Sequence, residues 1–277
     1  MSSYFPIPPN ILIKDFEYKI YGSTTFLNIP NNRLKKSILG KPYNSIIYLG
    51  LYYLNEENWI LIKVFECNPY EFVEVHRKNL KVYDNQMLLL VPKTIKDFPD
   101  QAKELPRPDS LRLDKSPVAE RCSLNFHFKK SITSYQGEYP FQMASLKKSS
   151  FLSFDGLKQI SKDNNLINFL IFMNINTHSE SQEEVIIKVF NPENIEIKKN
   201  IIAKKNAFTI HRIGDENLSG IDNKILFYTS EHSSFIPITL SVNLHNNQLS
   251  AEHTHPPSKF FAGNKSDVIK LIKNNWI

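Results

Sequence analysis

The chain has 277 residues, of which 41% are hydrophobic and 12% aromatic, and it carries a formal net charge of +6. This length and composition suit two packed domains and exclude wholesale disorder. The lysines are spread along the chain instead of gathering in one segment with interleaved aromatic residues, so nucleic acid is not an expected partner.

The two cysteines and the N-terminal segment indicate in which cellular compartment the protein is expected. Cys67 and Cys122 are too few and too far apart for a disulfide scaffold or a zinc finger. The first residues show no basic segment followed by an apolar one, as a secretory signal requires. No apolar run approaches the length of a membrane span. We therefore expect a cytoplasmic protein without a transmembrane segment.

Hydrophobic and polar residues alternate along most of the chain, which is typical of half-buried β-strands. The runs with this pattern cover residues 45–54, 59–67, 71–76, 86–92, 123–128, 151–157, 168–175, 184–191, 195–202, 207–213, 224–230 and 237–244. Turn residues separate most of them at intervals of about ten residues, the spacing of sandwiches and barrels. The sequence therefore predicts an all-β fold built from β-sandwich domains.

Two parts of the chain resemble each other. WILIKVFECNP at 59–69 is similar to EVIIKVFNP at 184–192, and matching segments precede and follow each copy in the same order. Four parallel segments with loop-sized length changes favour an internal duplication. The repeated unit resembles immunoglobulin-like sandwich modules, over residues 15–98 and 121–256, which implies two related sandwich domains.

The stretch between the two copies is rich in proline and charge, which marks a linker or a surface strap. We predict an N-terminal β-sandwich domain at 1–98, a proline-rich linker at 99–120 and a C-terminal β-sandwich domain at 121–277. The segment 265–277 predicts a short terminal helix, because Ser266 can cap it and its apolar residues share one face.

The sequence EHTHPP places two histidines, His253 and His255, one residue apart. On a strand both imidazoles point to the same side, which gives half of a zinc, iron or manganese site. His127 or His232 is a candidate third ligand, and Glu252, Glu138 or Glu231 is a candidate base. Two other interpretations remain: a strand end that the prolines terminate, and a pair of histidines that titrates near neutral pH.

The stretch SYQGEYPFQM supplies a second candidate site, formed by Tyr135, Glu138, Tyr139 and Phe141. Aromatic rings beside a carboxylate suit a glycan, because the rings stack on the sugar and the carboxylate accepts from its hydroxyl groups. The same composition equally suits a loop whose tyrosines pack against the sandwich edge.

No motif of nucleophilic catalysis, phosphate binding or dinucleotide binding occurs. We expect a non-catalytic binding protein with a glycan or protein ligand on the C-terminal domain. The alternative is a metal-dependent enzyme that uses His253 and His255. A third hypothesis is a structural subunit whose strand edges pair in an assembly, with its oligomeric state open.

Overall fold

The computed structural model describes residues 2–29, 46–109, 111, 121–141, 151–154, 165–176, 184–191, 196–213, 225–228 and 235–253. Antiparallel strands make up nearly all of the regular structure, with single 3₁₀ turns at η1 (Lys14–Phe16) and η2 (Arg77–Asn79). The all-β prediction is confirmed. The segment predicted as a C-terminal helix lies outside the described residues. The chain forms two compact units, Met1–Ser145 and Leu146–Ile277.

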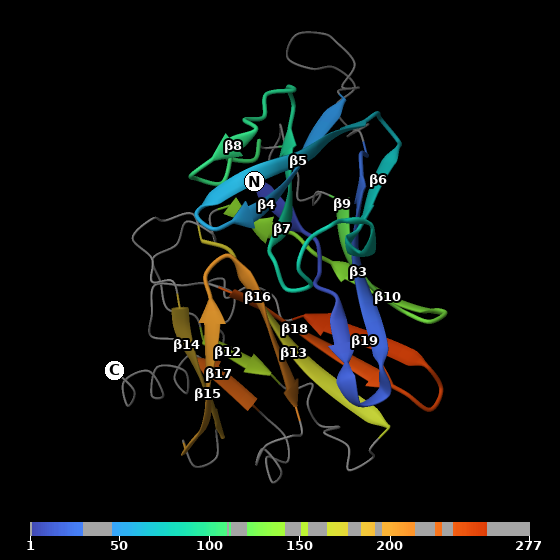
Figure 1. Cartoon of the computed structure of the whole chain (residues 1–277), viewed down its shortest axis with the longest axis vertical. Coiled ribbons are helices and arrows are strands. Elements are labelled where there is room, and N and C mark those ends of the chain that lie inside the picture. Colours follow the sequence, from blue (N-terminus) through green and yellow to red (C-terminus); the bar gives the residue numbers. More distant parts are fainter. Residues whose placement is uncertain are drawn as a thin grey trace, which may run out of the picture. The chain divides into compact units, whose positions relative to one another are not determined.

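The first unit contains a six-stranded sheet with the order β11-β1-β7-β4-β5-β8 (Figure 1). Its strands are β1 (Ser3–Pro6), β4 (Ile47–Asn55), β5 (Asn58–Cys67), β7 (Leu88–Lys93), β8 (Gln101–Ala102) and β11 (Tyr139–Pro140). The inner strand β7 is apolar and buried from Leu88 to Pro92, as expected of a strand covered on both faces, and only its last residue, Lys93, is partly exposed.

The second sheet of this unit is built around β3 (Tyr18–Leu27). The strand β9 (Arg121–Phe128) pairs with one edge of β3 and β6 (Phe72–His76) with the other (Figure 1). β2 (Ile11–Ile13) also pairs with β3, and β10 (Ser131–Gln136) extends the sheet beyond β9. The rings of Phe5 and Phe26, 5.2 Å apart, bring β1 of the first sheet against β3 of the second.

Alternation along these strands separates a buried face from a polar one. On β9, Leu124, Phe126 and Phe128 are buried in the core, whereas Asn125 and His127 belong to the opposite face. The same periodicity holds on β3 and β6, so all three strands direct a set of polar side chains to one side of the sheet.

The boundary between the units differs from the sequence-based one. Strand pairing places residues 121–140 in the first unit: β9 pairs with β3 from Tyr21↔His127 to Leu27↔Arg121, and β11 pairs with β1. The sequence predicts that residue 121 opens the second domain, because the proline-rich stretch before it has the composition of a linker. A long-range register of this kind leaves no local trace in the sequence.

The second unit contains two four-stranded sheets with the orders β12-β17-β14-β15 and β16-β13-β18-β19 (Figure 1). Their strands are β12 (Phe151–Phe154), β13 (Leu166–Asn174), β14 (Glu184–Asn191), β15 (Glu196–Lys204), β16 (Ala207–Ile213), β17 (Ile225–Tyr228), β18 (Phe235–Asn243) and β19 (Gln248–His253). Buried Phe169, Ile171, Ile238 and Leu240 place the centre of this core on β13 and β18.

The strands that carry the repeated sequence pair in partly different ways. β4 pairs with β7, and the corresponding strands β13 and β16 pair as well. However, β5 forms a hairpin with β4, whereas its counterpart β14 belongs to a different sheet from β13. One strand pairing is therefore the same in both copies and the other differs. The internal duplication stays a prediction.

Candidate metal site

Three neighbouring strands assemble a polar cluster on the outer face of the β3 sheet. Ser23 on β3 lies opposite His76 on β6 and opposite Asn125 on β9. His127 is two residues beyond Asn125 on β9, and Glu74 is two residues before His76 on β6. Because side chains two residues apart share a face, all five project to the same side of the sheet.

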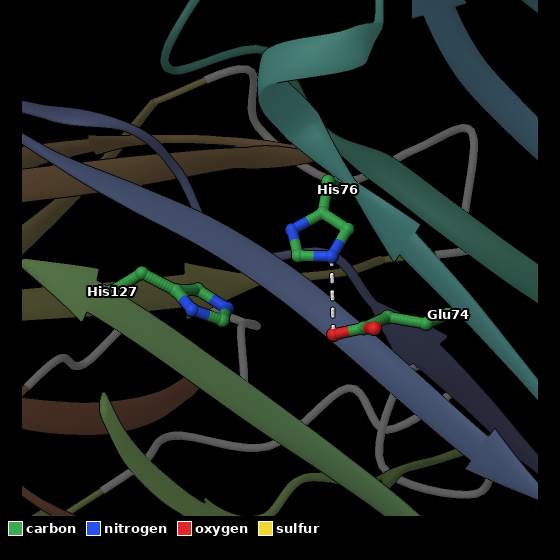
Figure 2. Close-up of side chains that lie close together, drawn as sticks. All are labelled: Glu74, His76 and His127. Atoms are coloured by element: carbon green, nitrogen blue, oxygen red, sulfur yellow. Dashed lines mark ion pairs between the residues drawn. The ribbon is translucent and has the colours of Figure 1, made fainter. Parts of the chain in front are cut away.

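Glu74, His76 and His127 form the centre of this cluster. One ligand atom from each residue lies within 4.8 Å of the corresponding atoms of the other two. His76 Nε2 is 3.2 Å from Glu74 Oε1, and the two imidazole ring centroids are 5.2 Å apart. Figure 2 shows the three side chains turned toward one another, from β6 on one side and β9 on the other, with β3 running between them.

The cluster is only partly shielded from solvent. The side chains of His76 and Glu74 are 25% and 34% exposed, so water can reach them. Partial burial lowers the pKa of His127 below its ordinary value, and the nearby His76 and Lys78 lower it further, while Glu74 opposes them. His127 is therefore neutral at physiological pH, the state in which an imidazole can bind a metal.

A hydrogen-bonded layer beneath the cluster fixes its members. Ser23 Oγ lies 2.7 Å from His127 Nε2 and donates to Glu74 Oε1 over 3.4 Å. The amide of Asn125 donates to Ser23 Oγ at 3.2 Å and to Thr25 Oγ1 at 3.0 Å. Ser23 and Asn125 are buried, so these contacts hold both ends of the cluster in register without help from bulk water.

The strand carrying His76 is anchored from behind by Arg77, the next residue. Its guanidinium is fully buried and donates to the carbonyl oxygens of Pro8 at 2.7 Å, Ile7 at 2.8 Å and Tyr83 at 3.1 Å. Pro8 also lies directly against Gly22, where a Cβ atom would overlap its carbonyl oxygen. Pro8 therefore contacts both Arg77, the residue after His76, and Gly22, the residue before Ser23.

The donor set of two imidazoles and one carboxylate matches the chemistry of zinc, iron and manganese sites. Metal bonds of about 2.0–2.2 Å place neighbouring ligand atoms of one ion roughly 3.0–3.5 Å apart. The 3.2 Å separation of His76 Nε2 and Glu74 Oε1 already has this length. The ligand atom of His127 lies within 4.8 Å of both, so a bound ion would draw the three atoms together into one shared set.

The histidines singled out from the sequence are placed differently. His253 is the last residue of β19 in the second unit, paired with Ile238, and His255 and His232 lie outside the described residues. His127, expected as a third ligand for that pair, lies beside His76 in the first unit instead. The structure describes no site formed by His253.

Two of the four aromatic-loop residues are buried. Tyr135 and Tyr139 are buried, and burial raises the pKa of the Tyr135 hydroxyl. Phe141 packs near Tyr4 and under the Arg107 guanidinium, whose central carbon is 4.7 Å from the ring centroid. Glu138 accepts a hydrogen bond from Gln136. A ligand site on this loop stays a prediction.

Sequence reasoning missed Glu74 and His76, although both lie in a strand that the alternation predicts. Their spacing could have revealed them. In Glu74-Val75-His76 the carboxylate and the imidazole are two positions apart and share one face of a strand, as do His253 and His255 on the same assumption. The partnership with His127 had no such signal, because it depends on β6 and β9 flanking β3.

No protein-family model matches the chain, and neither do the curated proteins and solved structures with which it was compared. Among the described residues, no helix has both the length and the apolar character that crossing a membrane requires.

Proposed function

We propose that this chain is a metal-binding protein whose first unit holds one divalent transition-metal ion on Glu74, His76 and His127. The observation that carries the proposal is the approach of three ligand atoms, from two non-adjacent strands, to within 4.8 Å of one another. Two imidazoles and one carboxylate form a donor set with affinity for zinc, iron and manganese.

Three protein ligands leave further coordination positions for water or a small ligand, which is the arrangement of metal sites that do chemistry. The exposure of His76 and Glu74 gives a water molecule access to these positions. A metal-dependent enzyme therefore remains the alternative within this proposal, with the metal on the first unit instead of on His253 and His255.

The test is calorimetric titration of the purified, untagged chain with Zn²⁺, Mn²⁺ and anaerobic Fe²⁺, together with metal analysis of the protein as isolated. We expect one equivalent of at least one of these ions. The variants His76→Ala, His127→Ala and Glu74→Gln should each weaken its binding by at least tenfold, since each removes a ligand.

Two control variants distinguish the site from adventitious binding. His245→Ala removes an exposed histidine from a turn of the second unit and should leave affinity unchanged. The double variant His253→Ala/His255→Ala tests the pair favoured by the sequence. Loss of binding in this double variant, with retention in His76→Ala, would refute the proposal.

A further inference from the structure

The hydroxyl of Ser23 lies between the ligand atoms of the proposed site. Its oxygen is 2.7 Å from His127 Nε2 and 3.4 Å from Glu74 Oε1, and Glu74 Oε1 is 3.2 Å from His76 Nε2. Three successive separations therefore fall close to the distance between adjacent ligands of one metal ion, about 3.0–3.5 Å. The Ser23 oxygen bridges the gap between His127 and the Glu74–His76 pair.

The surroundings hold this oxygen in place. Ser23 is fully buried, and the Asn125 amide donates to it from the neighbouring strand. That bond uses one lone pair of the hydroxyl oxygen. When His127 Nε2 carries no proton, as metal binding requires, the 2.7 Å contact takes the proton of the hydroxyl and the second lone pair is left available. Because bulk water does not reach the Ser23 hydroxyl, its remaining partners are the ligand atoms of the cluster.

We propose that Ser23 Oγ is a fourth ligand atom of the metal ion, an inference that rests on the function proposed above. Ser23 binds as a neutral hydroxyl that keeps its proton, so coordination is the only bond formed. The complete donor set is two imidazole nitrogens and two oxygens. Serine thereby raises the affinity for ions that favour oxygen ligands and higher coordination numbers, Mn²⁺ and Fe²⁺, relative to Zn²⁺.

Cobalt spectroscopy of a cysteine variant tests direct coordination. Ser23→Cys replaces the hydroxyl with a thiol of similar shape, and a thiolate bound to Co²⁺ gives an intense sulfur-to-metal charge-transfer absorption in the near ultraviolet. We expect this band in Ser23→Cys loaded with one equivalent of Co²⁺. It should be absent from the wild type, which accounts for the native Cys67 and Cys122.

Thr25→Cys is the matched control. Thr25 lies on the same strand and face as Ser23, two residues away, and also accepts a hydrogen bond from Asn125. A thiol there should give no charge-transfer band. A band of equal intensity in both cysteine variants, or in neither while cobalt is bound, would overturn the assignment of Ser23 as a ligand.

A second measurement uses a variant that introduces no new ligand. Ser23→Ala should weaken Mn²⁺ binding by about 10- to 100-fold and Zn²⁺ binding by less. Equal losses for both ions, or no loss, would contradict the role in metal preference. Wild-type protein that takes up none of these ions, and shows no cobalt d–d bands, refutes the proposed function itself, whereas d–d bands without the thiolate band refute the Ser23 inference alone.

Discussion

Arg77 Nε donates a 2.7 Å hydrogen bond to the carbonyl oxygen of Pro8, a residue 69 positions earlier in the chain. The same guanidinium also binds the carbonyl of Ile7. A buried arginine thus ties the N-terminal segment to the end of the strand that carries His76. The rigidity of the proposed metal site depends on this contact as well as on the ligands.

Replacing Arg77 with methionine should lower the free energy of unfolding by about 3 kcal/mol or more, because buried carbonyl oxygens lose their donors. Urea denaturation followed by tryptophan fluorescence measures the change. The neighbouring variant Lys78→Met alters an exposed side chain and should stay within about 0.5 kcal/mol of wild type. Similar effects of the two variants would argue against Arg77 as an anchor.

Gly22→Ala should reduce both stability and metal affinity. Its new methyl group overlaps the carbonyl oxygen of Pro8, which is backbone and cannot rotate aside, at a cost of about 1–3 kcal/mol. Gly50→Ala is the matched control, since its methyl group meets the ring of Phe98 away from the cluster. We expect calorimetry to show weaker metal binding for Gly22→Ala and unchanged binding for Gly50→Ala.

The stability of the metal-free protein should fall in mild acid through His127. Its pKa is lowered from 6.5 in the folded state, so the unfolded chain binds more protons in this range. The contribution is fully present above pH 6.5 and is lost as the pH falls toward the lowered pKa. Unfolding in urea at about pH 7.5 and about pH 5.5 should show a smaller difference for His127→Gln than for wild type.

The groups around His127 also determine how large this pH effect is. His76, Lys78 and Glu74 are the ionisable neighbours that act on it, and the first two reinforce the lowering while Glu74 opposes it. Glu74→Gln should therefore move the His127 titration to still lower pH, as NMR of the imidazole protons can follow. A shift to higher pH would contradict this electrostatic assignment.

Metal addition should stabilise the folded chain by mass action. At a free ion concentration one hundred times the dissociation constant, the free energy of unfolding rises by about 2.7 kcal/mol. A chelator should return the urea midpoint to its metal-free value. The variant Glu74→Gln should show little response at the same ion concentration, and an undiminished response would place the bound ion elsewhere.

The sequence predicted the strands well and their partners poorly. Alternation in 123–128 identifies β9, and even separates the core residues Leu124 and Phe126 from the polar His127. It carries no information on which strand lies beside β9, since any half-buried strand offers the same pattern. For that reason the expected domain begins at residue 121, whereas the compact units divide between Ser145 and Leu146.

The candidate site shows the same limit. The spacing of Glu74 and His76 is visible locally, but their meeting with His127 depends on the registers Ser23↔His76 and Tyr21↔His127. The sequence predicts a site at His253 and His255 because only one residue separates them. The group that the structure brings together consists of residues far apart in sequence, on strands β6 and β9 that both pair with β3.

The contact between Ser23 and His127 joins residues 104 positions apart, and it exists only after β3 has paired with β9. An unfolded or partly folded chain therefore offers an ion no preformed site. Since such long loops close late in folding, a bound ion should slow unfolding much more than it speeds refolding. Metal would then act on this protein chiefly by extending the lifetime of the folded state.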